Sequence, residues 1–197
     1  MTVVVISYPP SAGGNHLKNI LCLDSSFANS QDLNRSKYFD GEREVHSTSG
    51  RNMQLYRIEE AETATSDYIL HGHFGELAPW RDRINAIQNK KWLIISIDTR
   101  QDQDLLDDRQ HRLGQFGHEY YLREEQPYLY QREFYQTYFT GLNDDIYTIA
   151  LSDFWNPDFQ QTQIIYKLNV FLNKNINQEE AQILHNHWHL NNDINHN

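Results

Sequence analysis

The sequence predicts an α/β fold in which a mainly parallel central sheet is flanked by helices in three layers. Short apolar runs rich in β-branched residues are typical of strands that are buried on both faces of a parallel sheet. Segments with apolar residues at helical spacing lie between these runs, so strands and helices alternate along the chain. A chain of 197 residues supports one substantial core, and we therefore expect a single domain over residues 1–197.

Four strands and several helices follow from these patterns in chain order. The predicted strands are residues 2–8, 68–70, 92–97 and 146–151. The predicted helices are residues 15–23, 79–89, 160–172 and 178–188. Residues 24–52 are polar with little periodicity, which indicates a long surface excursion. From Leu105 to about Thr140 aromatic and polar residues are interleaved, a pattern typical of helices with one aromatic face.

Charge and composition narrow the classes of partner and the cellular compartment. The formal net charge of -10 repels phosphate backbones and anionic membrane surfaces, so we expect neither a nucleic-acid partner nor a membrane partner. The single cysteine, Cys22, cannot form an internal disulfide, and a buried reduced thiol favours a cytoplasmic setting. The apolar run Val3–Ile6 is too short for a membrane span and lacks a basic leader, which predicts no targeting segment.

The turn after the first predicted strand is a candidate anion site, with the sequence PPSAGG ahead of a helix. A helix N-terminus presents backbone N–H groups to an anion, and glycines let the backbone approach it closely. The side chains of Ser11, Asn15 and His16 add donors at the same place. The Walker pattern is not met, and an ordinary tight turn is the alternative interpretation.

The residues from Ser7 to Leu17, SYPPSAGGNHL, resemble the 5'-phosphosulfate loop of sulfotransferases, in which the first strand leads into Tyr-Pro-x-Ser-Gly. Three further landmarks occur in that family's order. They are Gly72-His73 ahead of Phe74, Leu77 and Pro79; Arg100 with Asp104; and IYTIALSDFWNPDF ahead of Asn169-Val170-Phe171-Leu172. The chain departs from the family at Pro10, where many members have a lysine, and at Asp108, where a serine is expected.

The resemblance implies a P-loop NTPase-like fold and transfer of a sulfuryl group from 3'-phosphoadenosine 5'-phosphosulfate to a hydroxyl or amine of a small-molecule or glycan acceptor. The donor would be held by the loop residues Ser11, Ala12, Gly13, Gly14, Asn15 and His16. Arg100 and Asp108 occupy the family's positions for the 3'-phosphate, although the Asp108 carboxylate would repel that group. The alternative role of Arg100 is a salt bridge to a neighbouring aspartate.

Sulfuryl transfer needs a base, and His73 is the first candidate because it follows the second predicted strand. Imidazole titrates near neutral pH, and the carboxyl ends of parallel strands face the ligand crevice. A hydrogen-bonded structural histidine is the alternative interpretation. Glu76 is a reserve base, and Lys18 points either at the phosphate or, as most lysines do, into solvent.

Two other functions compete with the transferase. Asp98 ends the third apolar run and is similar to a Walker B carboxylate that holds Mg²⁺ in a nucleotide kinase. The missing lysine at Pro10 and the missing serine at Asp108 favour a non-catalytic phosphate-binding module, whereas the retained His73 favours the enzyme. His185, His187 and His189 alternate along a predicted helix and lack acidic partners at ligand spacing, so we expect no metal there.

Overall fold

The computed structural model describes residues 1–9, 12–33, 51–114, 127–139 and 145–193, with side chains omitted at 51–56, 109–114 and 191–193. Its sheet has four strands, and every neighbouring pair is parallel. The strands are β1 (Val3–Ser7), β2 (Tyr68–Gly72), β3 (Lys90–Ser96) and β4 (Ile146–Ala150). The predicted parallel sheet is therefore confirmed, and each predicted strand overlaps an observed one.

The strand order β2-β1-β3-β4 determines where a ligand crevice forms. Val3 of β1 is in register with Tyr68 of β2 and with Lys90 of β3, so β1 lies in the middle and all five of its residues are buried. In one of the two common doubly wound orders, the chain direction along the sheet reverses between the first and third strands. Ligands bind outside the carboxyl ends of the strands at that point.

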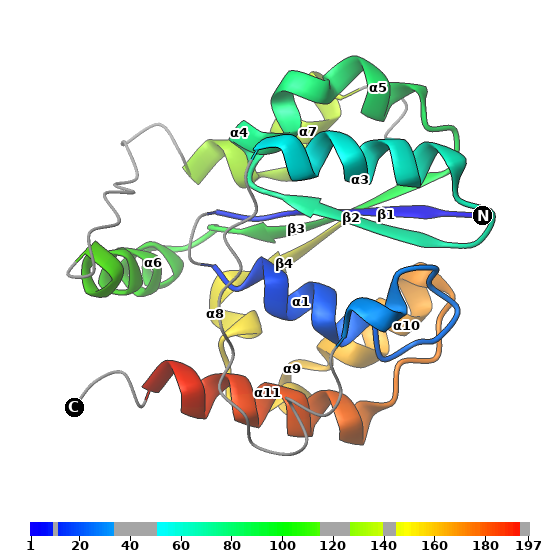
Figure 1. The fold of residues 1–197 in the computed structure, drawn as a ribbon. Coiled ribbons are helices and arrows are strands. Elements are labelled where there is room, and N and C mark those ends of the chain that lie inside the picture. The colour runs from blue at the N-terminus through cyan, green and yellow to red at the C-terminus, as the bar shows by residue number, and fades with distance from the viewer. Residues whose placement is uncertain (10–11, 34–50, 115–126, 140–144, 194–197) are drawn as a thin grey trace.

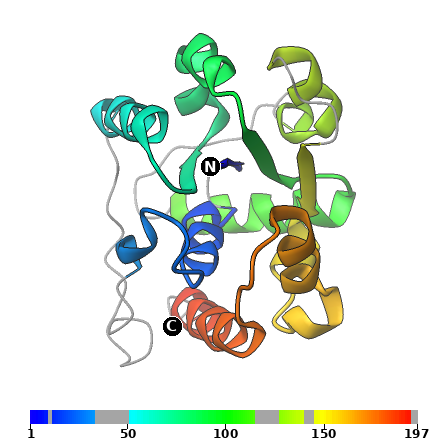
Figure 2. The same ribbon diagram turned by 90° about the vertical axis from the view of Figure 1, so that its right-hand side faces the viewer.

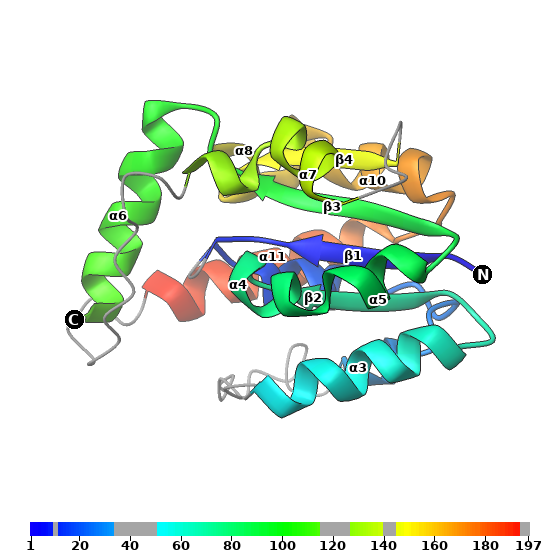
Figure 3. The same ribbon diagram turned by 90° about the horizontal axis from the view of Figure 1, so that it is seen from above.

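Helices cover both faces of the sheet (Figures 1 and 2). One face carries α3 (Arg51–Thr63), α4 (Phe74–Leu77), η2 (Ala78–Trp80), α5 (Arg81–Ala86), η3 (Pro127–Tyr130) and α7 (Arg132–Tyr138). The other carries α1 (Gly14–Leu21), α8 (Leu151–Phe154), α9 (Phe159–Thr162), α10 (Ile164–Leu172) and α11 (Gln178–Asp193). Helix α6 (Arg100–Gly114) lies beside the carboxyl edge (Figure 3).

Alternation along β1 divides the apolar core between these two helical layers. Val4 and Ile6 belong to the cluster shared with α1, α10 and α11, whereas Val3 and Val5 belong to the cluster shared with α3 and α7. Successive side chains of a strand point to opposite faces, so a strand buried on both sides must be apolar at every position. This requirement explains the continuous run that predicts the strand.

The helices differ from the predicted ones at several points, and the short helices α4 and α8 have no predicted counterpart. The segment 160–172 is divided into α9 and α10 because Gln163 has a left-handed φ of 56°, which a regular helix cannot contain. Helix α3 has no counterpart among the predicted helices. Of the polar segment 24–52, the described part contains the short helix η1 (Ser30–Asp32) and the start of α3, and residues 34–50 lie outside the described residues.

The side chain of Asn29 protects the outer edge of β2. Its amide nitrogen donates to the carbonyl of Ile69 at 2.9 Å, and its amide oxygen accepts from the Ile69 N–H at 3.1 Å. One side chain thus replaces a neighbouring strand at that residue, and an edge left open would be a template for association.

Among the described helices, none combines the length and apolar content needed to cross a membrane.

Candidate active site

The loop after β1 brings Gly13 and Gly14 into positions that larger residues would not fit. Gly13 is the N-cap of α1 with φ 89°, a left-handed value that favours glycine. A Cβ on Gly13 would lie 2.8 Å from the ring of Trp188, and a Cβ on Gly14 would overlap the ring of Tyr8. The glycines therefore let the helix start directly against two aromatic rings.

The N-terminus of α1 provides backbone donors. The N–H of Leu17 bonds to the Gly13 carbonyl and the N–H of Ala12 bonds to the Pro9 carbonyl, each at 3.1 Å. Between them, the N–H groups of Gly14, Asn15 and His16 have no acceptor within the described part of the chain. These donors and the positive end of the helix dipole attract an anion. Ser11, the remaining predicted loop residue, lies outside the described residues.

Behind this loop lies a hydrogen-bond relay whose polarity is set by Arg57 of α3. A guanidinium only donates, so its 2.6 Å bond goes to the lone pair of His71 Nε2. His71 Nδ1–H then donates to the Tyr8 hydroxyl at 3.2 Å, and this hydroxyl donates to Asn15 Oδ1 at 3.4 Å. Burial, and then the charge of Arg57, hold the pKa of His71 well below its usual value, which keeps the ring neutral.

His73 lies next to the same tyrosine, at the carboxyl end of β2. Its Nδ1 is 3.1 Å from the Tyr8 carbonyl, and because a carbonyl only accepts, the Nδ1 carries the proton. In the neutral ring the Nε2 atom then holds the lone pair, which is the form a general base requires. The His73 backbone N–H donates to Glu76 at 2.9 Å, so Glu76 fixes the start of α4 and the position of the histidine.

Two predicted site residues point away from the loop. Lys18 is only 8% exposed and binds Asp32 at 2.6 Å, so the expectation of a solvated lysine is wrong. His16 is 2% exposed, and its Nε2 lies 3.0 Å from Nδ1 of His185 on α11. Its side chain is therefore not a donor at the loop surface, and only its backbone N–H remains available there.

The residues after β3 are separated from this cluster in sequence but lie at the same sheet edge. Arg100 is exposed at the start of α6 and makes no ion pair within the described part of the chain. Asp108 is exposed two turns further along the same helix. Asp98 is exposed and accepts a hydrogen bond from Ser96 at 2.7 Å.

Asp102 is the buried carboxylate at this edge of the sheet. From the sequence, its only expected role was as one of the aspartates that could form a salt bridge with Arg100. It accepts hydrogen bonds from the backbone of Asp98 and Thr99, and from Ser152 at 2.6 Å, so it ties the end of β3 to the end of β4. Burial alone would raise the pKa of Asp102, but the bonds from Ser152 and Thr99 outweigh burial and hold it below its usual value. The spacing Thr99-x-x-Asp102 resembles a capping box and is a readable signal for this role.

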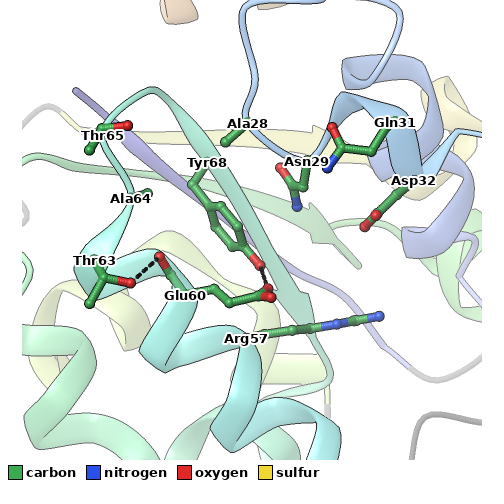
Figure 4. Close-up of a pocket in the computed structure, with 10 residues that line it drawn as sticks. All are labelled: Ala28, Asn29, Gln31, Asp32, Arg57, Glu60, Thr63, Ala64, Thr65 and Tyr68. Atoms are coloured by element: carbon green, nitrogen blue, oxygen red, sulfur yellow. Dashed lines mark hydrogen bonds between the residues drawn. The ribbon is translucent and has the colours of Figure 1, made fainter.

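A groove of ≈ 360 Å³ lies beside β2, with Arg57, Glu60, Asp32 and Tyr68 among its lining residues (Figure 4). Its polar groups are bonded to protein partners. The Tyr68 hydroxyl donates to Glu60 at 2.6 Å, Asp32 binds Lys18, and Arg57 binds His71. Because these groups are already bonded to protein partners, we place the ligand at the loop and not in the groove.

The described residues contain no cluster of histidine, cysteine and acidic side chains that is suited to a metal ion.

Comparison with known proteins adds no relative. No protein-family model matches the sequence, and neither a curated protein nor a solved structure matches it at a significant level. A functional assignment must therefore come from the geometry of the loop and of His73.

Proposed function

We propose that the chain is a sulfotransferase-like enzyme with a P-loop NTPase-like fold, which transfers a sulfuryl group from 3'-phosphoadenosine 5'-phosphosulfate to a hydroxyl or amine of a small-molecule or glycan acceptor. The observation that carries the proposal is the position of His73. Its Nδ1 binds the carbonyl of Tyr8, the residue that leads into the anion loop, and its Nε2 keeps a lone pair. A base beside an anion site is the arrangement that this transfer needs.

In the proposed reaction the two parts of the site have separate tasks. The N–H groups of Gly14, Asn15 and His16 stabilise the negative charge that develops on the leaving phosphate. His73 Nε2 accepts the proton of the acceptor hydroxyl as its oxygen bonds to sulfur and the bond from sulfur to the phosphate oxygen breaks. Tyr8 connects the tasks, since its carbonyl orients the base and its ring lies under Gly14.

A second candidate, a phosphate-binding module without turnover, is favoured by one observation. The ammonium of Lys18 is bound to Asp32, so the cation nearest in sequence to the loop is neutralised elsewhere. Two measurements together distinguish the candidates. One is calorimetric titration with 3'-phosphoadenosine 5'-phosphate and with inorganic phosphate alone, and the other is an activity assay. The transferase binds the nucleotide without Mg²⁺ and turns over, whereas the module binds but does not turn over. Binding of ATP only with Mg²⁺ would instead indicate a kinase that uses Asp98.

The His73→Ala variant tests the assigned base. Loss of a general base lowers turnover by about 10²- to 10⁴-fold. Nucleotide affinity should change little, because the backbone donors of α1 are untouched. The control is His187→Ala, which removes a half-buried histidine of α11 and should leave turnover unchanged. Wild-type turnover in His73→Ala would contradict the assignment, as would an equal loss in both variants.

A further inference from the structure

Three histidines and a carbonyl form a hydrogen-bond chain between α1 and α11. His16 Nε2 lies 3.0 Å from His185 Nδ1, and His185 Nε2 lies 2.8 Å from the carbonyl of Asn156. Nε2 of His189 lies 3.0 Å from the same His185 Nε2. His16 and His185 are 2% and 0% exposed, so the hydrogen bond between these two rings is shielded from solvent.

The Asn156 carbonyl determines where the protons of this hydrogen-bond chain lie. The Asn156 carbonyl only accepts, so His185 Nε2 carries a proton and His185 Nδ1 is a lone pair. His16 Nε2 must therefore donate to it, which leaves His16 Nδ1 as a buried lone pair with no partner in the described structure. The bonds require a neutral ring for His185, and a proton added at His16 Nδ1 would be buried without an acceptor.

The surroundings offer little compensation for an added proton, because burial outweighs the bond from His185 to the Asn156 carbonyl, which by itself would raise the pKa of His185. His16 stacks on Trp188 with ring centroids 4.5 Å apart, and His185 stacks on Phe159 of α9 at 3.5 Å. Phe154 of α8 packs against both histidines. The titratable groups that act on His16 and His185 among the described residues are these histidines and His189, and like charges repel. Burial first, and then the neighbouring histidines, hold the pKa of His16 well below its usual value.

The same contacts reach the anion loop through two tryptophans. The Trp188 ring lies against Gly13, at 2.8 Å from the position of a Cβ on that glycine. Trp155 packs edge-on against Trp188 with centroids 5.3 Å apart, and its indole N–H donates to the Ala12 carbonyl at 3.1 Å. Helix α11 thus supports the loop that starts α1.

We propose that His16, His185 and His189 form a proton-sensitive clamp, in which protonation detaches α11 from α1 and removes Trp188 from beneath the anion loop. The released histidines can charge freely in water, whereas the clamped ones cannot, so acid favours the detached state. The clamp determines how α11 is held and does not depend on which reaction the site performs.

Hydrogen exchange of the full chain tests the clamp. Below about pH 6.5, the protection of α11 amides, corrected for intrinsic exchange, should fall by up to tenfold per pH unit for each histidine that charges on release. Amides of β1 and β3 should keep their protection over the same range. A uniform loss across the molecule, or no loss in α11 down to about pH 4.5, would overturn the proposal.

A matched pair of variants tests whether His16 and His185 of the clamp cause the acid response. In H16Q/H185Q each amide can donate and accept as the imidazoles do, but neither group titrates, so the part of the acid response of α11 that comes from His16 and His185 should disappear. His187 lies on the same helix but outside the clamp, so His187→Gln should keep the wild-type response. An acid response in H16Q/H185Q as large as that of the wild type would refute the clamp.

Histidine ring ¹⁵N spectra of the wild type give a readout that needs no variant. Both His16 and His185 should be neutral with the proton on Nε2 near neutral pH, and both should charge together with the loss of α11 protection. A charged ring near pH 6 while α11 stays protected would overturn the proposal even if the double variant failed to fold.

Discussion

Replacing Gly14 with alanine should destabilise the protein, although alanine is the better helix former. The added Cβ would lie inside the Tyr8 ring, well under the 3.0 Å below which real Cβ contacts are essentially absent. The ring cannot simply turn aside, because its hydroxyl is bonded to His71 and its edge packs against His73 with centroids 4.7 Å apart. Either the ring or the first turn of α1 must therefore move.

The expected cost is the balance of three terms. Overpacking of a filled site costs about 1–3 kcal/mol. Loss of the hydrogen bond between Tyr8 and His71 adds about 0.5–1.5 kcal/mol. The gain in helix propensity offsets at most about 1 kcal/mol. The net effect is a destabilisation of about 0.5–4.5 kcal/mol.

Urea unfolding measures this cost as a lower midpoint with an unchanged slope. Gly75→Ala is the matched control, because Gly75 lies in the helix α4 and a Cβ there meets nothing within 4 Å. The control should be neutral or more stable by up to about 1 kcal/mol. A Gly14→Ala protein as stable as Gly75→Ala would refute the clash with Tyr8.

A double-mutant cycle identifies the atoms responsible. In a Tyr8→Leu background the ring is gone, so Gly14→Ala should lose most of its cost, and the coupling energy should fall in the range of about 0.5–3 kcal/mol found for residues in contact. If Gly14→Ala costs as much in the Tyr8→Leu background as in the wild type, the strain lies in the backbone and the clash with the ring is not its cause.

Two further substitutions probe the sheet edges. Asp102→Asn should lower the free energy of unfolding by at least about 3 kcal/mol at neutral pH, since bonds to a charged group contribute about 1.5–3 kcal/mol each and at least two are lost. Because the folded pKa of Asp102 is depressed, its stabilisation is present above the unfolded value of about 3.9 and is lost as pH falls through the folded pKa, so unfolding curves of the two proteins should converge in acid. Asn29→Leu leaves the N–H and C=O of Ile69 unpaired at the edge of β2. Light scattering should therefore show association that rises with protein concentration. A strictly monomeric variant would contradict the proposed protection of this edge by Asn29.

The sequence alone determined the strands and their parallel arrangement. A run such as Val3–Ile6 must be buried on both faces, and helices between such runs favour parallel neighbours, so local pattern decides these features. The start of α1 at the glycine turn follows in the same way, and so does the placement of His73 after β2. Helix α3 was missed because its apolar residues show almost no helical periodicity, and packing against β2 holds it in place.

The tertiary structure alone decided which side chains work together. Lys18 and His16 sit where a phosphate-binding role was expected, but partners at Asp32 and His185 bury them, and His185 is 169 positions away from His16. Arg57, which sets the polarity of the relay to Tyr8, carries no local signal at all. Backbone pattern reports how a segment alternates between core and solvent, whereas the partner of a buried polar group is fixed by contacts between distant segments, and only the folded chain brings these segments together.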